Sequence, residues 1–177
     1  MKFKLAIIAW ISGLLFAVNS TVAVEPAPIG LKTDIEFAKV GDVSLTLDAF
    51  VPEGAGPFPV CILVHGGGFV RGDKQSYIKP LFEPLSKAGF AWFTINYRLA
   101  PQHRWPACAE DVETAVRWVK VHAKDYKVDV GRIALIGESA GGHLVSWVGT
   151  VTGPPRAGTP SDRLRRQPPR SPPENKP

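Results

Sequence analysis

A mostly apolar run, residues 132–136, leads without a break into the pentapeptide Gly137-Glu138-Ser139-Ala140-Gly141. This Gly-x-Ser-x-Gly spacing is typical of a sharp turn from a β-strand into an α-helix, which lifts the serine Oγ above the sheet. Side chains at the two glycine positions would collide in such a turn. The pattern therefore favours a strand, a tight turn and a helix, and it makes Ser139 a candidate nucleophile.

A second glycine-rich turn, His65-Gly66-Gly67-Gly68, follows another short apolar run, residues 60–64. Consecutive glycines let backbone N–H groups approach a ligand oxygen, and such donors stabilise the negative charge that develops on a carbonyl oxygen during acyl transfer. Alone, the turn is equally compatible with a flexible loop that binds nothing. Two such turns, each at the carboxyl end of a buried strand, favour a hydrolase site.

Strands and helices alternate along the middle of the chain. The hydrophobic patterns predict strands at residues 35–40, 43–51, 60–64, 90–96 and 132–136, and helices at residues 78–87, 106–124 and 139–150. Two strands followed by β-α-β-α-β-α imply an α/β fold, with helices on both faces of a mostly parallel sheet.

The formal charge of +5 is concentrated at the two ends of the chain. Residues 1–23 contribute +2 and residues 154–177 contribute +4, so the remaining residues carry −1. The body of the protein is therefore nearly neutral, and we expect no nucleic-acid partner.

Residues 1–23 have the pattern of a secretory signal peptide. Lys2 and Lys4 precede an apolar run, and small residues end at Ala23, a plausible cleavage position. A membrane anchor is the alternative, but the run is shorter than the roughly 18–20 residues that span a bilayer. We therefore expect an exported protein, periplasmic or secreted, with no stable membrane span after cleavage. Cys61 and Cys108 would then meet oxidising conditions, but two separately buried thiols are favoured over a disulfide.

Residues 154–177 hold eight of the 17 prolines and no aromatic residue. Such a composition predicts a Pro/Arg-rich disordered tail that follows a folded domain at residues 24–153. The tail has two interpretations. It is either a natural basic segment, which would meet anionic surfaces, or the product of translation outside the original reading frame, the interpretation that we favour.

Residues 35–152 resemble the N-terminal half of an α/β-hydrolase esterase, of the hormone-sensitive-lipase-like group and the related bacterial feruloyl/acetyl esterases. Three segments carry the resemblance. They are His65-Gly66-Gly67-Gly68, Tyr97-Arg98-Leu99-Ala100-Pro101 with Trp105-Pro106-Ala107, and Gly137-Glu138-Ser139-Ala140-Gly141-Gly142. The resemblance implies an incomplete α/β-hydrolase fold, with a two-strand start and alternating strands and helices that end at the nucleophile helix.

The resemblance also implies site roles. Ser139 would be the nucleophile, and the backbone N–H groups of Gly67, Gly68 and Ala140 would form the oxyanion hole, supported by His65, Gly66, Gly137 and Gly141. The implied reaction is hydrolysis of short-chain carboxylic esters without a cofactor or metal. The substrate would be a small-molecule ester, and acetylated or feruloylated carbohydrates, aryl esters and short lipids remain open.

Simpler interpretations apply to the neighbouring residues. His65 is expected to brace the glycine turn rather than to titrate in catalysis, and Glu138 to support the turn or lie at its rim. Arg98 and Asp111 are expected to make structural polar contacts. Trp105 is expected to pack rather than touch substrate, and for Phe69 pocket lining and core burial are equally open.

The general base and its carboxylate are missing from the expected chain order. In α/β-hydrolases both follow the serine, but the histidines here are His65, His103, His122 and His143. His143 lies one helical turn beyond Ser139, on the wrong side to act as base. We therefore expect little or no activity from this chain alone, and an exposed apolar edge at residues 133–136 that promotes aggregation. A non-catalytic binding or scaffold module is the alternative function, and a peptidase is less favoured.

Overall fold

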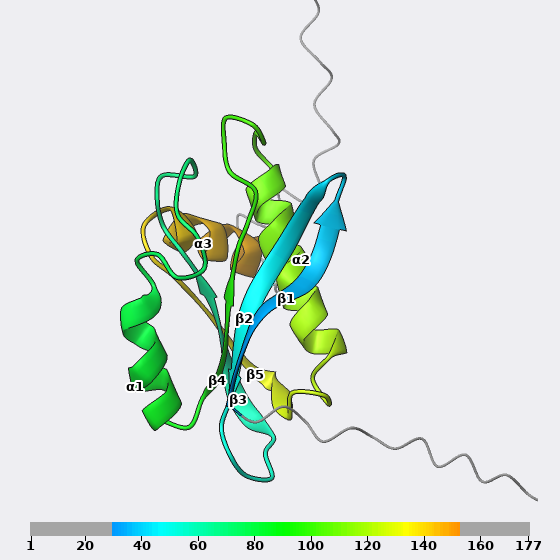
Figure 1. The fold of residues 1–177 in the computed structure, drawn as a ribbon, viewed down its shortest axis with the longest axis vertical. Helices are drawn as coiled ribbons and strands as arrows, with labels where there is room; N and C mark the ends of the chain where they lie inside the picture. The colour runs from blue at the N-terminus through cyan, green and yellow to red at the C-terminus, as the bar shows by residue number, and fades with distance from the viewer. Residues whose placement is uncertain (1–29, 153–177) are drawn as a thin grey trace, which may run out of the picture.

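Five strands form one mixed sheet with helices on both faces (Figure 1). The computed structural model describes residues 30–152, so the expectations for residues 1–23 and 154–177 lie outside the described residues. The elements in chain order are β1 (Gly30–Val40), β2 (Val43–Val51), β3 (Phe58–Val64), a 3₁₀ turn (Lys79–Leu81), α1 (Phe82–Lys87), β4 (Ala91–Ile95), α2 (Ala107–Val121), β5 (Val128–Gly137) and α3 (Ala140–Thr152).

The sheet order is β1-β2-β4-β3-β5. Strands β4, β3 and β5 are parallel, whereas β1 pairs antiparallel with β2 and β2 pairs antiparallel with β4. The expectation of a mostly parallel sheet is therefore wrong for the β1–β2 side. A short turn at Gly41-Asp42 reverses the chain between β1 and β2. No helix lies between β2 and β3, so there is no crossover connection that would make these two strands parallel.

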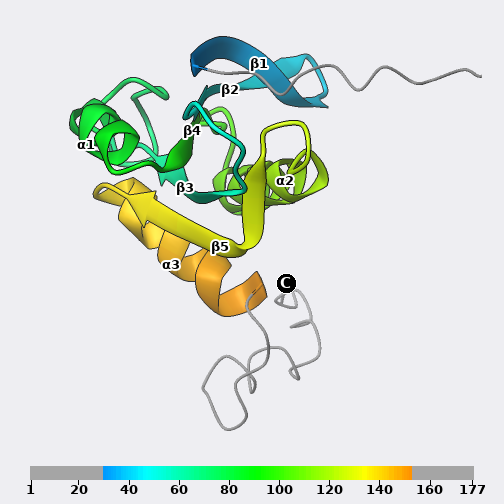
Figure 2. The same cartoon turned by 90° about the horizontal axis from the view of Figure 1, so that it is seen from below.

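The core is divided between the two faces of the sheet by the alternation of side chains along each strand. In β3, Val60, Ile62 and Val64 pack in the larger cluster with α2 and α3, while Cys61 and Leu63 point to the smaller cluster with α1. Figure 2 shows α1 and α2 on opposite sides of β3 and β4. The prediction of helices on both faces is confirmed.

The helix at α1 is shorter than the hydrophobic pattern predicts. Pro80 and Pro84 lack the backbone N–H that a continuous helix needs, and the segment divides into a 3₁₀ turn and six α-helical residues. The helix ends at Lys87, and Gly89, two residues later, has a φ of 77°, a left-handed conformation that glycine adopts without strain. Within residues 30–152, no helix has both the length and the apolar content needed to cross a membrane.

Strand β5 forms an edge of the described sheet, opposite β1 (Figure 2). It is longer than predicted, and its apolar residues are incompletely covered: Ile133 and Leu135 are half-buried and Ala134 is exposed. Unpaired N–H and C=O groups beside apolar side chains favour association with other strands. The exposed apolar edge expected from the sequence is thus present in the described part of the chain.

Candidate active site

Ser139 lies at the tip of the turn between β5 and α3. Its φ of 49° is a left-handed conformation that is strained for a residue other than glycine, and its side chain is exposed. A Cβ at Gly137 would overlap the carbonyl group of Gly141, and a Cβ at Gly141 would overlap the carbonyl oxygen of Val64. Both glycines are therefore required by close backbone packing, as the sequence predicts.

The glycine turn after β3 contacts the serine turn directly. The Glu138 backbone N–H donates to the Val64 carbonyl oxygen at 3.2 Å, and the Glu138 carboxylate occupies the space beside Gly66. Gly67 has a φ of 112°, and a Cβ there would overlap the Arg71 carbonyl. The Glu138 contacts agree with the expectation that this residue supports the turn or lies at its rim.

Three backbone N–H groups at this junction are unused within residues 30–152. Gly67, Gly68 and Ala140 donate to no backbone or side-chain acceptor in that part of the protein. Ala140 is the first residue of α3, where an α-helix leaves its N–H groups without an internal acceptor. These N–H groups are therefore free to donate hydrogen bonds to a ligand oxygen.

His65 is buried, with 1% of its surface exposed, and it supports the glycine turn. Its ring stacks on Tyr97 with a centroid separation of 4.2 Å, and its Nδ1 lies 2.7 Å from the Gly66 carbonyl oxygen. The Tyr97 hydroxyl donates to the His65 carbonyl at 3.0 Å. These contacts agree with the expected bracing role. The buried Nε2 has no partner among the described residues.

Burial lowers the pKa of His65, and the Gly66 hydrogen bond and the charges of Asp73 and Glu138 oppose the shift. Because the fold favours the neutral ring, His65 stabilises the protein fully above the ordinary histidine pKa of 6.5, and this contribution falls as the pH drops toward the lowered value.

We therefore predict that the free energy of unfolding decreases from about pH 7.5 to about pH 5.5 and that His65→Gln reduces this slope. Urea denaturation at several pH values measures this dependence of the unfolding free energy on pH. His143→Gln, which removes an exposed imidazole, is the matched control for His65→Gln. Equal slopes for the wild type and His65→Gln would contradict the role of burial.

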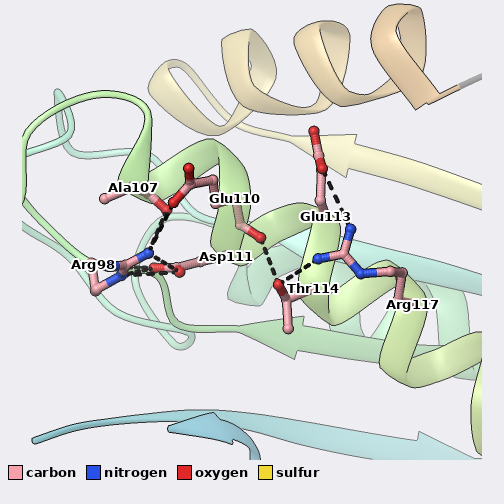
Figure 3. Close-up of polar contacts among 7 residues, drawn as sticks. All are labelled: Arg98, Ala107, Glu110, Asp111, Glu113, Thr114 and Arg117. Atoms are coloured by element: carbon pink, nitrogen blue, oxygen red, sulfur yellow. Dashed lines mark hydrogen bonds and ion pairs between the residues drawn. The ribbon is translucent and has the colours of Figure 1, made fainter. Parts of the chain in front are cut away.

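Arg98 and Asp111 connect the segment after β4 to the first turns of α2 (Figure 3). The Arg98 Nη2 lies 2.7 Å from Asp111 Oδ1, its Nε 2.9 Å from Oδ2, and its backbone N–H also donates to Oδ2 at 2.8 Å. The hydrogen bonds that Arg98 donates to the Asp111 carboxylate are the main cause of the raised pKa of Arg98. The structural role expected for both residues is confirmed.

An ion-pair cluster that the sequence does not predict holds the loop that follows the glycine turn; Lys74 and Asp48 are buried in it, and Asp34 is exposed. The Lys74 ammonium lies 2.6 Å from Asp34 and 3.1 Å from Asp48, and the Lys74 backbone N–H donates to Asn96 Oδ1 at 2.8 Å. These contacts fix the loop to β1, β2 and the end of β4. A lysine in a polar loop gives no local signal that it will be buried.

A cavity of about 390 Å³ opens beside Gly68, and aromatic side chains line it. The Phe69 and His143 rings meet edge to face at 5.9 Å between centroids, and His143 meets Trp105 at 6.3 Å. The Trp105 ring also contacts the Trp147 ring edge to face, with 5.1 Å between their centroids. Phe69 both lines the cavity and packs on the core, while Trp105 is half exposed, so packing alone does not describe it.

No base is paired with Ser139 within residues 30–152. The backbone N–H of His143 donates to the Ser139 carbonyl oxygen at 3.1 Å, but the His143 ring contacts Phe69 and Trp105 rather than the serine side chain.

Cys61 and Cys108 are both buried and unpaired, in different clusters of the core. No group of three or more metal-ligating side chains exists in the described part of the chain.

The strand order, the strained serine and the adjoining glycine turn define an incomplete α/β-hydrolase. Residues 47–165 match the BD-FAE family model, and the chain belongs to this family. The chain is 39% identical to the probable carboxylic ester hydrolase LipM of Mycobacterium tuberculosis over 101 residues, which cover 57% of this chain and 23% of LipM. Esterase LipI of the same organism is 40% identical over 90 residues, which cover 51% of this chain and 28% of LipI.

Among solved structures, esterase 2 of Thermogutta terrifontis superposes with a TM-score of 0.61 at 29% identity, covering 69% of this chain and 44% of that protein. The same esterase has been solved phosphorylated by paraoxon. The chain thus spans about a quarter of the curated relatives and under half of the structural neighbour.

Proposed function

We propose that this chain provides the nucleophile and the oxyanion hole of a carboxylic ester hydrolase. The observation that carries the proposal is the direct contact between the turn that holds Ser139 and the glycine turn, because each of the two turns also holds unused N–H groups, Ala140 in the first and Gly67 and Gly68 in the second. The esterase names of its relatives support the same reaction class.

In this reaction the Ser139 Oγ attacks the carbonyl carbon of an ester, and its proton passes to a base. The three N–H groups stabilise the resulting oxyanion, the alcohol leaves, and an acyl-enzyme remains on Ser139 until water hydrolyses it. An unactivated serine is a weak nucleophile, and the described residues offer it no base. The chain alone is therefore expected to hydrolyse esters little or not at all.

The substrate is proposed to be a small-molecule ester, with acetylated and feruloylated carbohydrates among the candidates. The signal-like residues 1–23 support a proposal of export to the periplasm or the medium.

The test is a chimera in which residues 30–152 replace the matching part of Thermogutta terrifontis esterase 2. We expect the chimera to hydrolyse an aryl acetate and Ser139→Ala to lower its kcat by about 10³-fold or more, because only the oxyanion hole remains. Ser146→Ala is the control on the same helix; within residues 30–152 its exposed hydroxyl donates only to the Gly142 carbonyl oxygen, and kcat should be unchanged.

A chimera whose kcat does not respond to Ser139→Ala would contradict the proposal. Turnover by the isolated chain that Ser139→Ala abolishes would support Ser139 as the nucleophile and would contradict only the expectation that the chain alone is inactive. A folded chimera that is inactive, together with a stable isolated chain, would favour the non-catalytic scaffold.

A further inference from the structure

A second hollow lies at the end of the sheet opposite Ser139. It has a volume of about 700 Å³ and lies between the loop joining β2 to β3, the carboxyl end of α2 and the beginning of β5. These segments meet at the lower end of the molecule in Figure 1. The volume falls within the roughly 300–1,000 Å³ of small-molecule sites.

The hollow carries an excess of positive charge. Lys120 lies in the last turn of α2 and Lys124 in the turn that follows the helix; both are exposed and contact no carboxylate within residues 30–152. The Lys127 ammonium donates to the Gly54 carbonyl oxygen at 3.1 Å, a neutral acceptor. The carboxylate in the lining, Asp129, is paired with Arg132 at 2.6 Å. Three ammonium groups therefore remain without a compensating negative charge.

Apolar side chains lie beside these charges. Val121 is 78% exposed and Val130 is 53% exposed, and both line the hollow. Lysines at the carboxyl end of α2 would also complement the helix dipole. That effect gives no reason for two exposed valines at the same place.

We propose that this hollow binds a single-chain carboxylate amphiphile, a fatty-acid anion. The ammonium groups of Lys120, Lys124 and Lys127 attract the carboxylate, and the valines cover part of the apolar chain. A neutral lipid would leave the lysines unused, and a small inorganic anion would leave the valines exposed to water. The site is separate from Ser139, so this proposal does not depend on the proposed hydrolase function.

To test this, the full ¹⁵N-labelled chain is titrated with octanoate below its critical micelle concentration, and the amide chemical shifts are followed by NMR. Saturable shifts of the Val121, Lys124 and Val130 amides are expected. Replacing two lysines (K120Q/K124Q) should weaken binding by about tenfold or more through loss of charge-assisted contacts. The matched control K32Q/K39Q removes the same charge from exposed positions on β1 and should bind as the wild type does.

Octanol carries the apolar chain without the charge, and inorganic phosphate carries charge without the chain. Both should bind at least about tenfold more weakly than octanoate. Octanol binding as tightly as octanoate would overturn the role of the lysines, and phosphate binding as tightly would reduce the hollow to a general anion site. The absence of saturable shifts, or equal affinities for the two double variants, would also overturn the proposal.

Discussion

Gly141→Ala is expected to destabilise the protein by about 3 kcal/mol or more, because the added methyl group overlaps backbone atoms that have no space to move. The Cβ would meet the carbonyl groups of Val64 and His65, which end β3 and begin the glycine turn. Separating α3 from β3 would relieve the overlap, but it would also break the contact between the two turns. Urea denaturation of the wild type and the variant measures the loss of unfolding free energy.

Gly149→Ala, in the same helix, is the control and should change the free energy of unfolding in the opposite direction. A Cβ at Gly149 meets no atom within 4 Å, and its φ is not in the left-handed region. Alanine restricts the unfolded chain more than glycine does, so this variant should be stabilised by about 0.5–1 kcal/mol. Equal effects of the two substitutions would contradict the close packing of the serine turn on β3.

Asp111→Ala is expected to lower the free energy of unfolding by about 3–5 kcal/mol, because it leaves the largely buried Arg98 without its buried carboxylate partner. The Arg98 side chain is 12% exposed and the Asp111 side chain is 2% exposed. The substitution also removes the acceptor of the Arg98 backbone N–H. Chemical denaturation measures the loss, and Figure 3 shows the contacts that disappear.

Glu113→Ala, also on α2, is the matched control for Asp111→Ala. Glu113 pairs with Arg117 at 3.4 Å across one turn of α2 (Figure 3), and the Arg117 side chain is 63% exposed. A solvent-exposed pair at this spacing contributes about 0.3–0.5 kcal/mol. Similar losses for Asp111→Ala and Glu113→Ala would show that burial of the Arg98 pair adds nothing.

The two turns of the site were predictable because local sequence determines them. Gly137 and Gly141 are required by backbone contacts that exclude a side chain, so the spacing around Ser139 specifies the turn. The apolar run at residues 60–64 likewise predicted a strand covered on both faces, and Val60 and Cys61 do lie in different clusters of the core. Short-range patterns with one structural solution can be read from sequence.

Contacts between distant segments could not be predicted in this way. Lys74 pairs with Asp34 across 40 residues, and neither residue has an unusual neighbourhood in the sequence. The row of rings from Phe69 to Trp147 depends on how α3 and the segment before α2 meet. The direction of β2 beside β4 was also not predicted, because its hydrophobic alternation is the same for parallel and antiparallel pairing.

We propose that Ser139, presented by the turn after β5, is the covalent nucleophile of an ester hydrolase. The most direct test of this claim is to expose the chimera with Thermogutta terrifontis esterase 2 to paraoxon and to determine the modified residue by peptide mass spectrometry. We predict one diethylphosphoryl group per molecule, on Ser139, and none in the Ser139→Ala variant. Modification of another residue, or a folded chimera that stays unmodified, would contradict the claim.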